Sequence, residues 1–228
     1  MQSVEAFKHK LEQEIPLTLQ IEELRSGVYR LYATDKTPLY FYSSGKYIPE
    51  TTGPGIHIEA KTWESKPIIL MHRIHTAWGF SKRFYARQTT CKRITSPISQ
   101  DFQRAHHMLV PLRGKYRYGL YRGEELVSIA VFSGFRKMGK TTTYRSIELL
   151  RFCHKDNYLV IGGLSKLISH MWRELQPDDL MTYIDQKWSN GHKFEQVGFQ
   201  VVGKYQDPDK NIYSLKLILK KDARYLKD

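Results

Sequence analysis

The stretch SIELLRFCHKDNYLVIGGLSKLISHMWRELQPDDLMTYIDQKWSNGHKFEQVGF, residues 146–199, indicates the fold of this chain most strongly. It begins with a β-like run to Cys153, and the pair Gly162-Gly163 then forms a turn that opens a helix over residues 164–175. A second strand over residues 180–185 follows, and Trp188-Ser189-Asn190-Gly191 leads into a short helix. This order predicts strands that alternate with helices.

The segments on either side continue the same pattern. Ser96-Pro97 is a helix start signal, and Arg122-Gly123-Glu124 is a tight turn between two strand-like runs. The predicted elements are strand 84–94, helix 99–107, strands 116–121, 126–132 and 144–153, helix 164–175, strand 180–185, a short helix at 191–197, and strands 199–205 and 212–219. They predict an α/β fold with a mixed sheet in three layers.

A cluster of turn formers at residues 48–55 divides the chain. Residues 1–55 are expected to form a small N-terminal extension, with a helix over 4–14 and a hairpin of strands 28–32 and 39–42. Residues 56–228 are expected to form the main domain. It would begin with a short strand at 56–59 and a helix from Glu64 or Ser65 to Trp78. The length and the 41% of hydrophobic residues suffice for one sizeable core.

The charge balance favours a polyanionic partner. Thirty-six Lys and Arg against twenty-three Asp and Glu give a formal net charge of +13, which most commonly serves nucleic-acid binding. Two cysteines and the lack of a long apolar run at the N-terminus predict a cytoplasmic protein with reduced thiols and no membrane partner. The oligomeric state is left open.

The glycine turn also has the pattern of a phosphate-binding site. In Val160-Ile161-Gly162-Gly163-Leu164-Ser165-Lys166, the first N–H groups of the helix lack intrahelical partners and attract phosphate. The turn and the order of elements resemble the second half of the GCN5-related N-acetyltransferase (GNAT) fold, in which this turn holds the pyrophosphate of coenzyme A. The resemblance implies an acetyl-CoA or related acyl-CoA cofactor bound by Val160, Ile161, Gly162, Gly163, Ser165 and Lys166.

The chain departs from the GNAT pattern at three positions. Leu159 replaces a basic residue, Leu164 replaces a small one, and Phe194 stands where many members have a tyrosine that protonates the leaving thiolate. A phenyl ring cannot donate a proton, so another group or water must act as the acid, and Tyr183 and Tyr205 are candidates. The alternative is that the two glycines only close a strand-to-helix turn.

A longer resemblance concerns residues 56–206. Short segments in the same order are similar to the C-terminal module of phage homing-endonuclease-like proteins: Trp63-Glu64-Ser65-Lys66, Tyr85-Ala86-Arg87, Phe102 with His107, Gly119-Leu120-Tyr121, Leu150-Arg151-Phe152-Cys153 and Asp185 with Trp188-Ser189-Asn190-Gly191. That module is related to phage proteins that modify adenine in DNA. The resemblance implies an association with DNA, more than with RNA.

Candidate residues for chemistry lie on two strands that are neighbours in the resembling fold. Glu148 and Arg151 lie on the strand that borders the acyl group there, and Asp185 ends the other strand, where ligands bind in such sheets. Glu148 is a possible general base, and Asp185 a possible orienting or proton-accepting group. His107 is added because it matches a histidine of the phage module. Candidates for binding the substrate are Arg151, Trp188, Ser189 and Asn190. Alternatively, Arg151 forms a buried ion pair with Glu148 or Asp185, and Ser189 or Asn190 caps the next helix.

Cations alternate with aromatic residues between Lys61 and Arg93, where eight Lys or Arg accompany a single acidic residue. Such a mixture suits phosphate contacts and base stacking. The predicted nucleic-acid contacts are Arg83, Arg87, Arg93, Lys115 and Arg117. The alternative is a solvated cationic face over an aromatic core.

Three functions therefore compete. The first is an acyltransferase-like enzyme that modifies a nucleobase or an amine associated with nucleic acid. The second is a DNA-binding accessory module whose coenzyme site no longer works. The third is a metal-dependent nuclease built on Asp35 and Glu59-Ala60-Lys61, although no metal site is assigned to the histidine pairs His72-x-x-His75 and His106-His107.

Overall fold

A computed structural model of the protein describes residues 2–44, 47, 53–138, 141–207 and 212–220. The chain packs as two compact units. Unit 1 comprises Met1–Phe80, Ile184–Asn190 and Lys204–Ser214, and unit 2 comprises Ser81–Tyr183, Gly191–Gly203 and Leu215–Asp228. Packing thus groups residues 56–80 with the N-terminal segment. The division at residue 55 stays a prediction about domain organisation, and most of the turn cluster at 48–55 lies outside the described residues.

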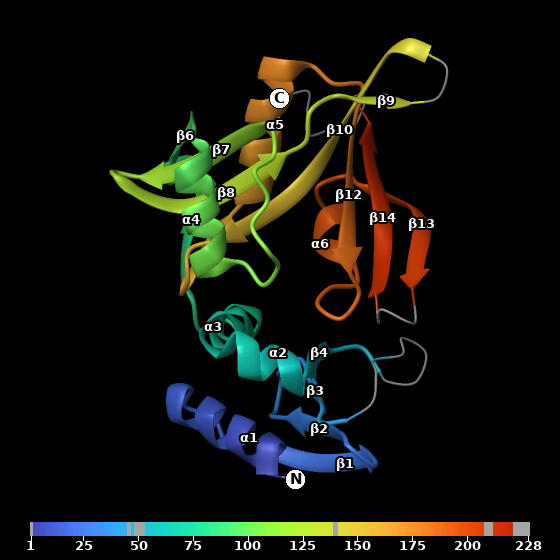
Figure 1. The fold of residues 1–228 in the computed structure, drawn as a ribbon. Helices are drawn as coiled ribbons and strands as arrows, with labels where there is room; N and C mark the ends of the chain where they lie inside the picture. Colours follow the sequence, from blue (N-terminus) through green and yellow to red (C-terminus); the bar gives the residue numbers. More distant parts are fainter. Residues whose placement is uncertain (1, 45–46, 48–52, 139–140, 208–211, 221–228) are drawn as a thin grey trace. The chain divides into compact units, whose positions relative to one another are not determined.

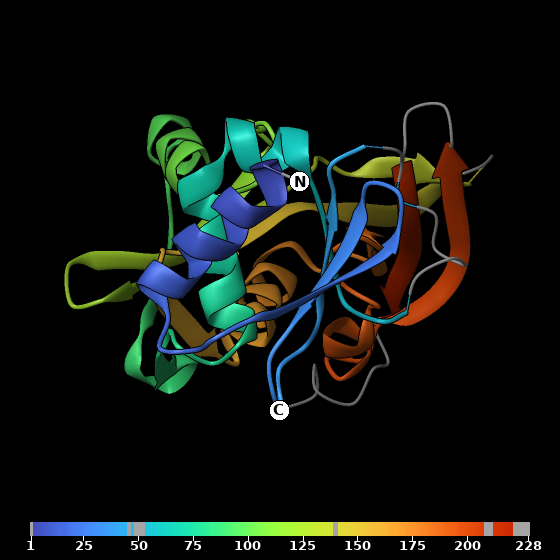
Figure 2. The ribbon, with the colours of Figure 1, turned by 90° about the horizontal axis from the view of Figure 1, so that it is seen from below.

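Unit 1 contains a four-stranded sheet in the order β1-β2-β3-β4. Its elements are α1 (Gln2–Glu14), β1 (Gln20–Arg25), β2 (Val28–Tyr32), β3 (Leu39–Tyr42), β4 (Ile56–Glu59), α2 (Ala60–Ser65) and α3 (Pro67–Ala77). Neighbouring strands are antiparallel, except that β4 is parallel to β3. Figure 2 shows α1 beside the blue strands, and Phe7 of α1 stacks on Phe41 with ring centroids 5.1 Å apart. The apolar side of α1 therefore forms part of the core of unit 1.

The local patterns of unit 1 are largely confirmed. The helix expected over 4–14 and the strands at 28–32, 39–42 and 56–59 are present. The single helix expected from Glu64 or Ser65 to Trp78 is wrong, because α2 ends at Ser65 and Pro67 begins α3. Proline lacks an N–H and fits the first position of a helix, so it starts a new one here.

Unit 2 contains most of a mixed sheet with the order β13-β14-β12-β10-β8-β7-β6, on which β9 pairs with β10 (Figure 1). The strands are β6 (Thr90–Arg93), β7 (Tyr116–Arg122), β8 (Glu125–Phe132), β9 (Arg136–Met138), β10 (Thr141–His154), β12 (Asp179–Asp185), β13 (Gln200–Asp207) and β14 (Ile212–Lys220). β10 is parallel to β12 and antiparallel to β8. The predicted mixed α/β class is confirmed.

Helices cover both faces of this sheet. Phe102 of α4 (Ser96–His106) packs with Val131, whereas His170 of α5 (Gly163–Leu175) lies 5.2 Å from Tyr118, measured between ring centroids. Tyr118 pairs with Ala130, the neighbour of Val131, so Tyr118 and Val131 point to opposite faces. Unit 2 therefore has three layers, with α4 on one face and α5 on the other. The short helix α6 (His192–Glu195) follows β12.

The continuous strand expected over 84–94 is wrong. β5 (Lys82–Tyr85) ends at the 3₁₀ turn η1 (Ala86–Gln88), and the Gln88 side chain accepts the N–H of Tyr85 at 3.1 Å. β5 pairs in parallel with β11 (Tyr158–Ile161), a strand that the sequence does not predict, while β6 joins the main sheet. The turn η1 thus divides the predicted strand into two strands, β5 and β6, that belong to different sheets.

No helix within the described ranges is both long and apolar enough to cross a membrane.

Candidate active site

The strands β10 and β12 part halfway along their length. They pair in parallel from Ser146 with Asp179 to Leu149 with Thr182, and their described residues show no further pairing, although β10 runs on to His154 and β12 to Asp185. The pairing of β10 with β8 is irregular between Leu149 and Arg151, which indicates a β-bulge. We call the opening beyond Leu149 and Thr182 the fork. Carboxyl ends of adjacent parallel strands are where ligands bind in α/β sheets.

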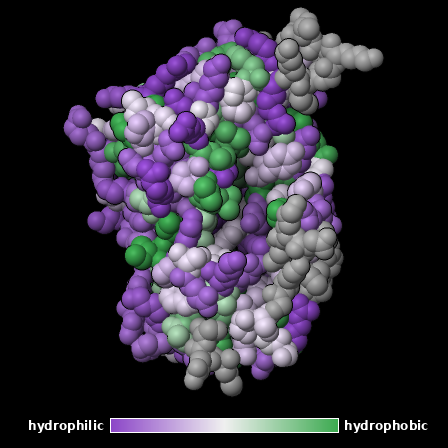
Figure 3. Space-filling model, viewed as in Figure 1, coloured by the Kyte–Doolittle hydropathy of each residue, from purple (hydrophilic) through white to green (hydrophobic). Residues whose placement is uncertain are grey.

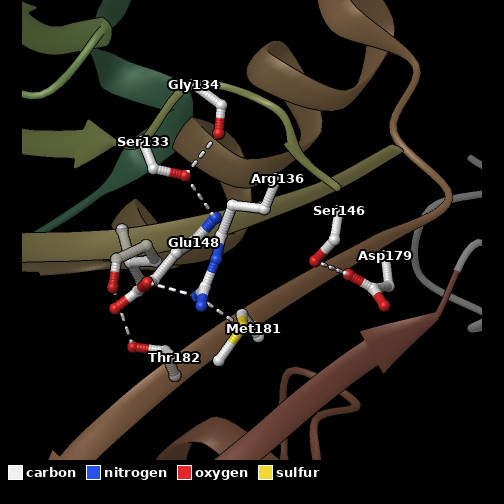
Figure 4. Close-up of polar contacts among 9 residues, drawn as sticks. Ser133, Gly134, Arg136, Ser146, Glu148, Asp179, Met181 and Thr182 are labelled. Atoms are coloured by element: carbon white, nitrogen blue, oxygen red, sulfur yellow. Dashed lines mark hydrogen bonds and ion pairs between the residues drawn. The ribbon is translucent and has the colours of Figure 1, made fainter. Parts of the chain in front are cut away.

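A buried carboxylate lies where the pairing of β10 with β12 begins. Asp179 is 3% exposed and accepts hydrogen bonds from Ser146 Oγ at 2.6 Å and from Tyr144 Oη at 2.7 Å (Figure 4 shows the first). Burial and the neighbouring Asp179 raise the pKa of Tyr144 to about 12. The phenol therefore keeps its proton and serves as a donor. These bonds align β10 with β12 at their first paired position, three residues before the strands part.

Glu148 lies one residue before the fork and has a cationic partner. Its Oε2 is 2.5 Å from Nη1 of Arg136 on β9, and the same guanidinium nitrogen lies 2.9 Å from Sδ of Met181 (Figure 4). The Glu148 N–H donates to Ser133 Oγ at 2.9 Å, and its carbonyl accepts the N–H of Ser133. Both the backbone and the carboxylate of Glu148 are thus held in place, while the side chain keeps some exposure to solvent.

The register places Glu148 on the face that α4 covers. Leu149 pairs with Phe132, whose neighbour Val131 packs against α4, so Leu149 points away from α4 and Glu148 toward it. Glu148 pairs with Met181, and Tyr183 lies two residues further along β12 on the same face. Tyr183 is 45% exposed. A carboxylate and a phenol therefore share one face of the sheet at the fork, the α4 face.

Arg151 also lies on the α4 face, since it pairs with Val131. Its Nη2 donates to the carbonyl of Val110 at 3.1 Å, and its Nη1 donates to the carbonyl of Leu150 at 2.7 Å. Burial lowers the pKa of Arg151 from its ordinary value. Neither ion pair considered from the sequence, with Glu148 or with Asp185, is the contact that holds this guanidinium. It fastens the loop after α4 to the fork.

The glycine turn has the backbone geometry expected for an anion site. Gly162 adopts φ +76°, precedes α5 without a side-chain cap and is exposed. A Cβ at Gly163 would lie 3.1 Å from Cβ of Val160, so a side chain there would need Val160 to shift by a few tenths of an ångström. Lys166 is held elsewhere: its Nζ donates to the carbonyls of Ala86, at 2.8 Å, and Thr89. The N–H groups of the turn are therefore the main groups there for a phosphate.

Other members of the predicted cofactor set have structural surroundings. Val160 is buried, and Ile161 ends β11 opposite Tyr85 of β5. Ser165 is partly exposed in the first turn of α5. Phe194 packs edge-on against Phe199 with ring centroids 5.5 Å apart. A packing role explains why a phenyl ring suits this position.

His107 has a role in the backbone of its loop. It follows α4 as the C-cap, and its Nδ1 accepts the N–H of Leu109 at 3.0 Å. The preceding His106 lies 3.1 Å from Asp156, and its ring packs against Phe102. These contacts brace the loop, and the proposed site role of His107 stays a prediction.

Asp185, Trp188, Ser189 and Asn190 belong to unit 1, whereas Glu148 belongs to unit 2. The Asp185 Oδ1 accepts the N–H of Lys187 at 2.9 Å, and its carbonyl accepts the N–H groups of Trp188 and Ser189. Burial raises the pKa of Asp185 above its ordinary value. The carboxylate therefore closes the turn after β12.

Ion pairs and ring contacts surround this turn within unit 1. Lys187 Nζ lies 2.7 Å from Glu59, and the Arg73 guanidinium lies 4.6 Å from the ring centroid of Trp188. Glu59, one of the acids of the nuclease hypothesis, is thus paired with a lysine. In the part of the chain that the structure describes, no three His, Cys, Asp or Glu side chains gather into a potential metal site.

The predicted nucleic-acid contacts differ in their surroundings. Arg83, Arg87, Arg93 and Lys115 are exposed. The Arg87 guanidinium lies 4.6 Å from the ring centroid of Tyr85, and Arg93 pairs with Glu174 on α5. Exposed cations beside aromatic rings are compatible with contacts to phosphates and bases.

Arg117 is engaged by its own loop. Its Nη1 donates to the carbonyls of Arg113, at 3.1 Å, and Gly114, at 2.7 Å. The bonds close the turn before β7. The contribution of Arg117 is therefore to hold the backbone there.

Sequence reasoning missed Arg136 and Ser133, the partners of Glu148. Both lie between β8 and β10, in a segment that reads only as a basic, glycine-containing loop. The short strand β9 brings Arg136 next to β10, and no sequence pattern indicates that pairing.

Comparison with known proteins gives matches among solved structures. No protein-family model matches the chain, and no curated protein matches it in sequence. The ribosomal-protein-S18-alanine N-acetyltransferase from Escherichia coli is 14% identical, with a TM-score of 0.44, and the match covers 58% of this chain and 93% of that one.

Two other solved structures match a similar share of the chain. NAA60 of Arabidopsis thaliana, in complex with acetyl-CoA, is 9% identical with a TM-score of 0.46, covering 58% of this chain and 99% of that one. A Bacillus subtilis acetyltransferase in complex with CoA is 15% identical with a TM-score of 0.44, covering 58% and 98%. The chain is thus similar to N-acetyltransferase structures over somewhat more than half of its length.

Proposed function

We propose that the protein is an acyltransferase that uses an acyl-CoA donor and transfers the acyl group to an amine of a nucleic acid, DNA more than RNA, or to an amine associated with it. The observation that carries this proposal is the fork. There a held carboxylate, Glu148, and an exposed phenol, Tyr183, share the α4 face beside two strands that have separated.

The chain offers a fitting place for the donor. Gly162 leaves the start of α5 open, because it has no side chain and, among the described residues other than its chain neighbours, only the Ala86 side chain comes within 4 Å of a Cβ at this position. The first N–H groups of α5 would hold the pyrophosphate. The backbones of β10 and β12 beyond Leu149 and Thr182 would hold the part of the donor that reaches the fork.

The side chains at the fork have the proton chemistry that the reaction needs. An acyl-CoA, when bound, supplies a thioester carbonyl as electrophile and a thiolate as leaving group, so that a C–N bond replaces a C–S bond. Glu148 accepts the proton that the acceptor amine loses. Tyr183 donates its hydroxyl proton to the departing sulfur and regains one from solvent, a role that Phe194 cannot fill.

Charge supports a nucleic-acid acceptor. The formal net charge of +13 attracts polyanions, and Arg83, Arg87 and Lys115 of unit 2 are exposed. The resemblance to a DNA-associated phage module supports DNA over RNA. A protein that uses these cations should lose affinity steeply with added salt.

The decisive experiment is an isothermal titration of the protein with acetyl-CoA. We expect binding by the wild type and none by Gly162→Trp, because the indole would occupy the start of α5. Gly123→Trp is the matched control, since Gly123 also has a positive φ, of +60°, and no described atom beyond its chain neighbours lies within 4 Å of a Cβ there. Absence of binding by the wild type would refute the proposal. Transfer of a labelled acetyl group to duplex DNA then tests the acceptor.

A second candidate is a DNA-binding module without a working coenzyme site. It is favoured by the engagement of Lys166 with the Ala86 and Thr89 carbonyls, which removes a cation from the turn. It predicts salt-sensitive DNA binding in a protein that gives no heat with acetyl-CoA. Neutralising Arg83, Arg87 and Arg93 together should then abolish the gel shift.

A further inference from the structure

The loop between α4 and β7 is held rigidly by side chains of unit 2. Gln103 of α4 donates to the carbonyl of Leu112 at 3.0 Å and accepts its N–H at 2.8 Å. Arg151 donates to the carbonyl of Val110, and His107 accepts the N–H of Leu109. Side chains therefore engage four backbone polar groups between Leu109 and Leu112, and Pro111 has no N–H to satisfy.

The tip of this braced loop is apolar and exposed. Leu109 is 50% and Val110 is 73% exposed. Figure 3 shows green surface over the loop that follows α4, with purple surface around it. Because neighbouring side chains satisfy much of the tip's backbone, the tip can enter an apolar environment without leaving those groups unpaired. Such a rigid pair of aliphatic side chains is suited to insertion.

The sequence on either side of the tip carries an excess of positive charge. No Asp or Glu occurs from Phe102 to Gly123, whereas that segment contains Arg104, Arg113, Lys115, Arg117 and Arg122. Arg113 and Lys115 are exposed just after the tip. A small apolar tip flanked by cations complements stacked bases flanked by phosphates. In contrast, two aliphatic side chains provide little apolar area to bury in a membrane, so they would anchor the protein to a lipid surface only weakly.

We propose that Leu109 and Val110 form a wedge that inserts into the base stack of duplex DNA. The wedge would unstack a base that lies against the α4 face of the protein. This inference rests on the proposed function, which requires a nucleic-acid acceptor. Base amines inside a duplex are stacked, and enzymes that act on bases take them out of the stack. Arg151 joins the wedge to the fork, because it lies on the α4 face with Glu148 and binds Val110.

The test uses the full-length protein and a DNA duplex that contains 2-aminopurine, whose fluorescence rises when it leaves the stack. The wild type should raise the fluorescence at saturation. The double variant Leu109→Ser, Val110→Ser should lose this rise and bind the duplex at least about tenfold more weakly, because the apolar contact is removed. Ile68→Ser, in unit 1, is the control at another exposed aliphatic residue, since Ile68 is 68% exposed.

A conservative variant separates insertion from folding. Leu109→Met with Val110→Ile keeps the apolar volume and should keep the fluorescence rise. Both positions are exposed, so thermal unfolding of all variants should match the wild type. An equal rise with the serine variant, or none with a DNA-bound wild type, would overturn the wedge and leave the proposed acyl transfer standing.

Two further outcomes identify other partners. A wild type that does not bind DNA would overturn both the wedge and the nucleic-acid acceptor, whereas its titration with acetyl-CoA would still report on the donor site. Vesicles of phosphatidylserine and phosphatidylcholine form the last arm. Binding to them that depends on Leu109 and Val110, without any fluorescence rise on DNA, would assign the loop to a lipid surface and refute insertion into DNA.

Discussion

Glu148 and Asp185 are two carboxylates that the sequence ranks alike as candidates, since Glu148 lies on one predicted strand and Asp185 ends its neighbour. Their partners differ. Glu148 contacts the guanidinium of Arg136 with its carboxylate, and separate bonds to Ser133 hold its backbone. Asp185 uses its carboxylate to accept the N–H of Lys187 and close its own turn. The Glu148 carboxylate is oriented by another side chain and accepts no backbone N–H in the turn, so it can accept a proton from a substrate. The Asp185 carboxylate accepts a backbone N–H that closes a turn, so it is needed for structure.

The largest expected effect tests the reactive side of this comparison. Glu148→Gln should lower kcat for acyl transfer by roughly 10²–10⁴-fold, because the amide cannot accept the proton of the amine. Acetyl-CoA binding should remain, since glutamine keeps the size of the side chain and the N–H groups proposed to hold the pyrophosphate are unchanged. Steady-state kinetics measures the change, with Asp185→Asn as the matched variant. Equal losses in the two variants would break the comparison.

The next effect is the loss of folding stability at acidic pH, which is separate from any pH dependence of the reaction. His154 ends β10, and burial lowers its pKa to about 4. In the unfolded chain, His154 binds a proton near the ordinary pKa of histidine, whereas in the folded protein it stays neutral down to about pH 4. The contribution of neutral His154 to the free energy of unfolding is therefore complete above the ordinary pKa and is lost as the pH falls toward about 4. The full loss is on the order of 3 kcal/mol.

Urea unfolding at neutral and at mildly acidic pH measures this term. His154→Gln should reduce the difference between the two conditions. His57 of unit 1 provides the matched case, because burial and Lys187 lower its pKa to about 4 as well. An undiminished pH dependence in both variants would show that other groups control the acid stability.

A smaller effect concerns the partner of Glu148. Arg136→Gln removes the charge-assisted bond to the carboxylate and should lower kcat by about tenfold, with little change in KM for the donor, because the side chain loses its fixed orientation. Arg136→Lys should restore part of the rate, since it restores the charge but not the planar guanidinium. A change confined to KM would mean that Arg136 binds substrate instead of positioning Glu148.

The smallest effect tests the structural side. Asp185→Ala removes the acceptor of the Lys187 N–H and should cost about 1 kcal/mol of stability. Asp185→Asn keeps an acceptor. Because burial raises the pKa of Asp185, the charged form is disfavoured in the folded state, and the asparagine variant should gain stability relative to the wild type as the pH rises above the acidic range. Thermal unfolding of both variants checks this order.

Local sequence patterns predicted much of the fold and part of the candidate active site. Alternating and helical spacing of apolar residues located α1, α4, α5 and most strands, because that spacing is set by the geometry of a single element. η1, β1, β9 and β11 were not predicted; β1, for example, is exposed along most of its length and therefore lacks the alternation of apolar and polar residues that indicates a strand. The glycine turn was recognisable because Gly162 adopts a positive φ that other residues resist.

The partners of Glu148 were not recognisable, because they come from pairing between segments. Arg136 reaches Glu148 through the pairing of β9 with β10, and Ser133 reaches it through the end of β8. Lys166 shows the opposite case: a lysine that suits a phosphate in the sequence binds two carbonyls near η1. Neither outcome follows from residue type or spacing.

The sequence by itself determined the cationic character of the protein, the kinds of its elements and the glycine turn, since these depend on composition and on neighbours along the chain. Only the tertiary structure decided that β10 and β12 part after Leu149, that Glu148 and Tyr183 share one face, and that Arg151 ties the Leu109–Val110 tip to that face. The physical reason is that register and side-chain partners are set by packing between distant segments.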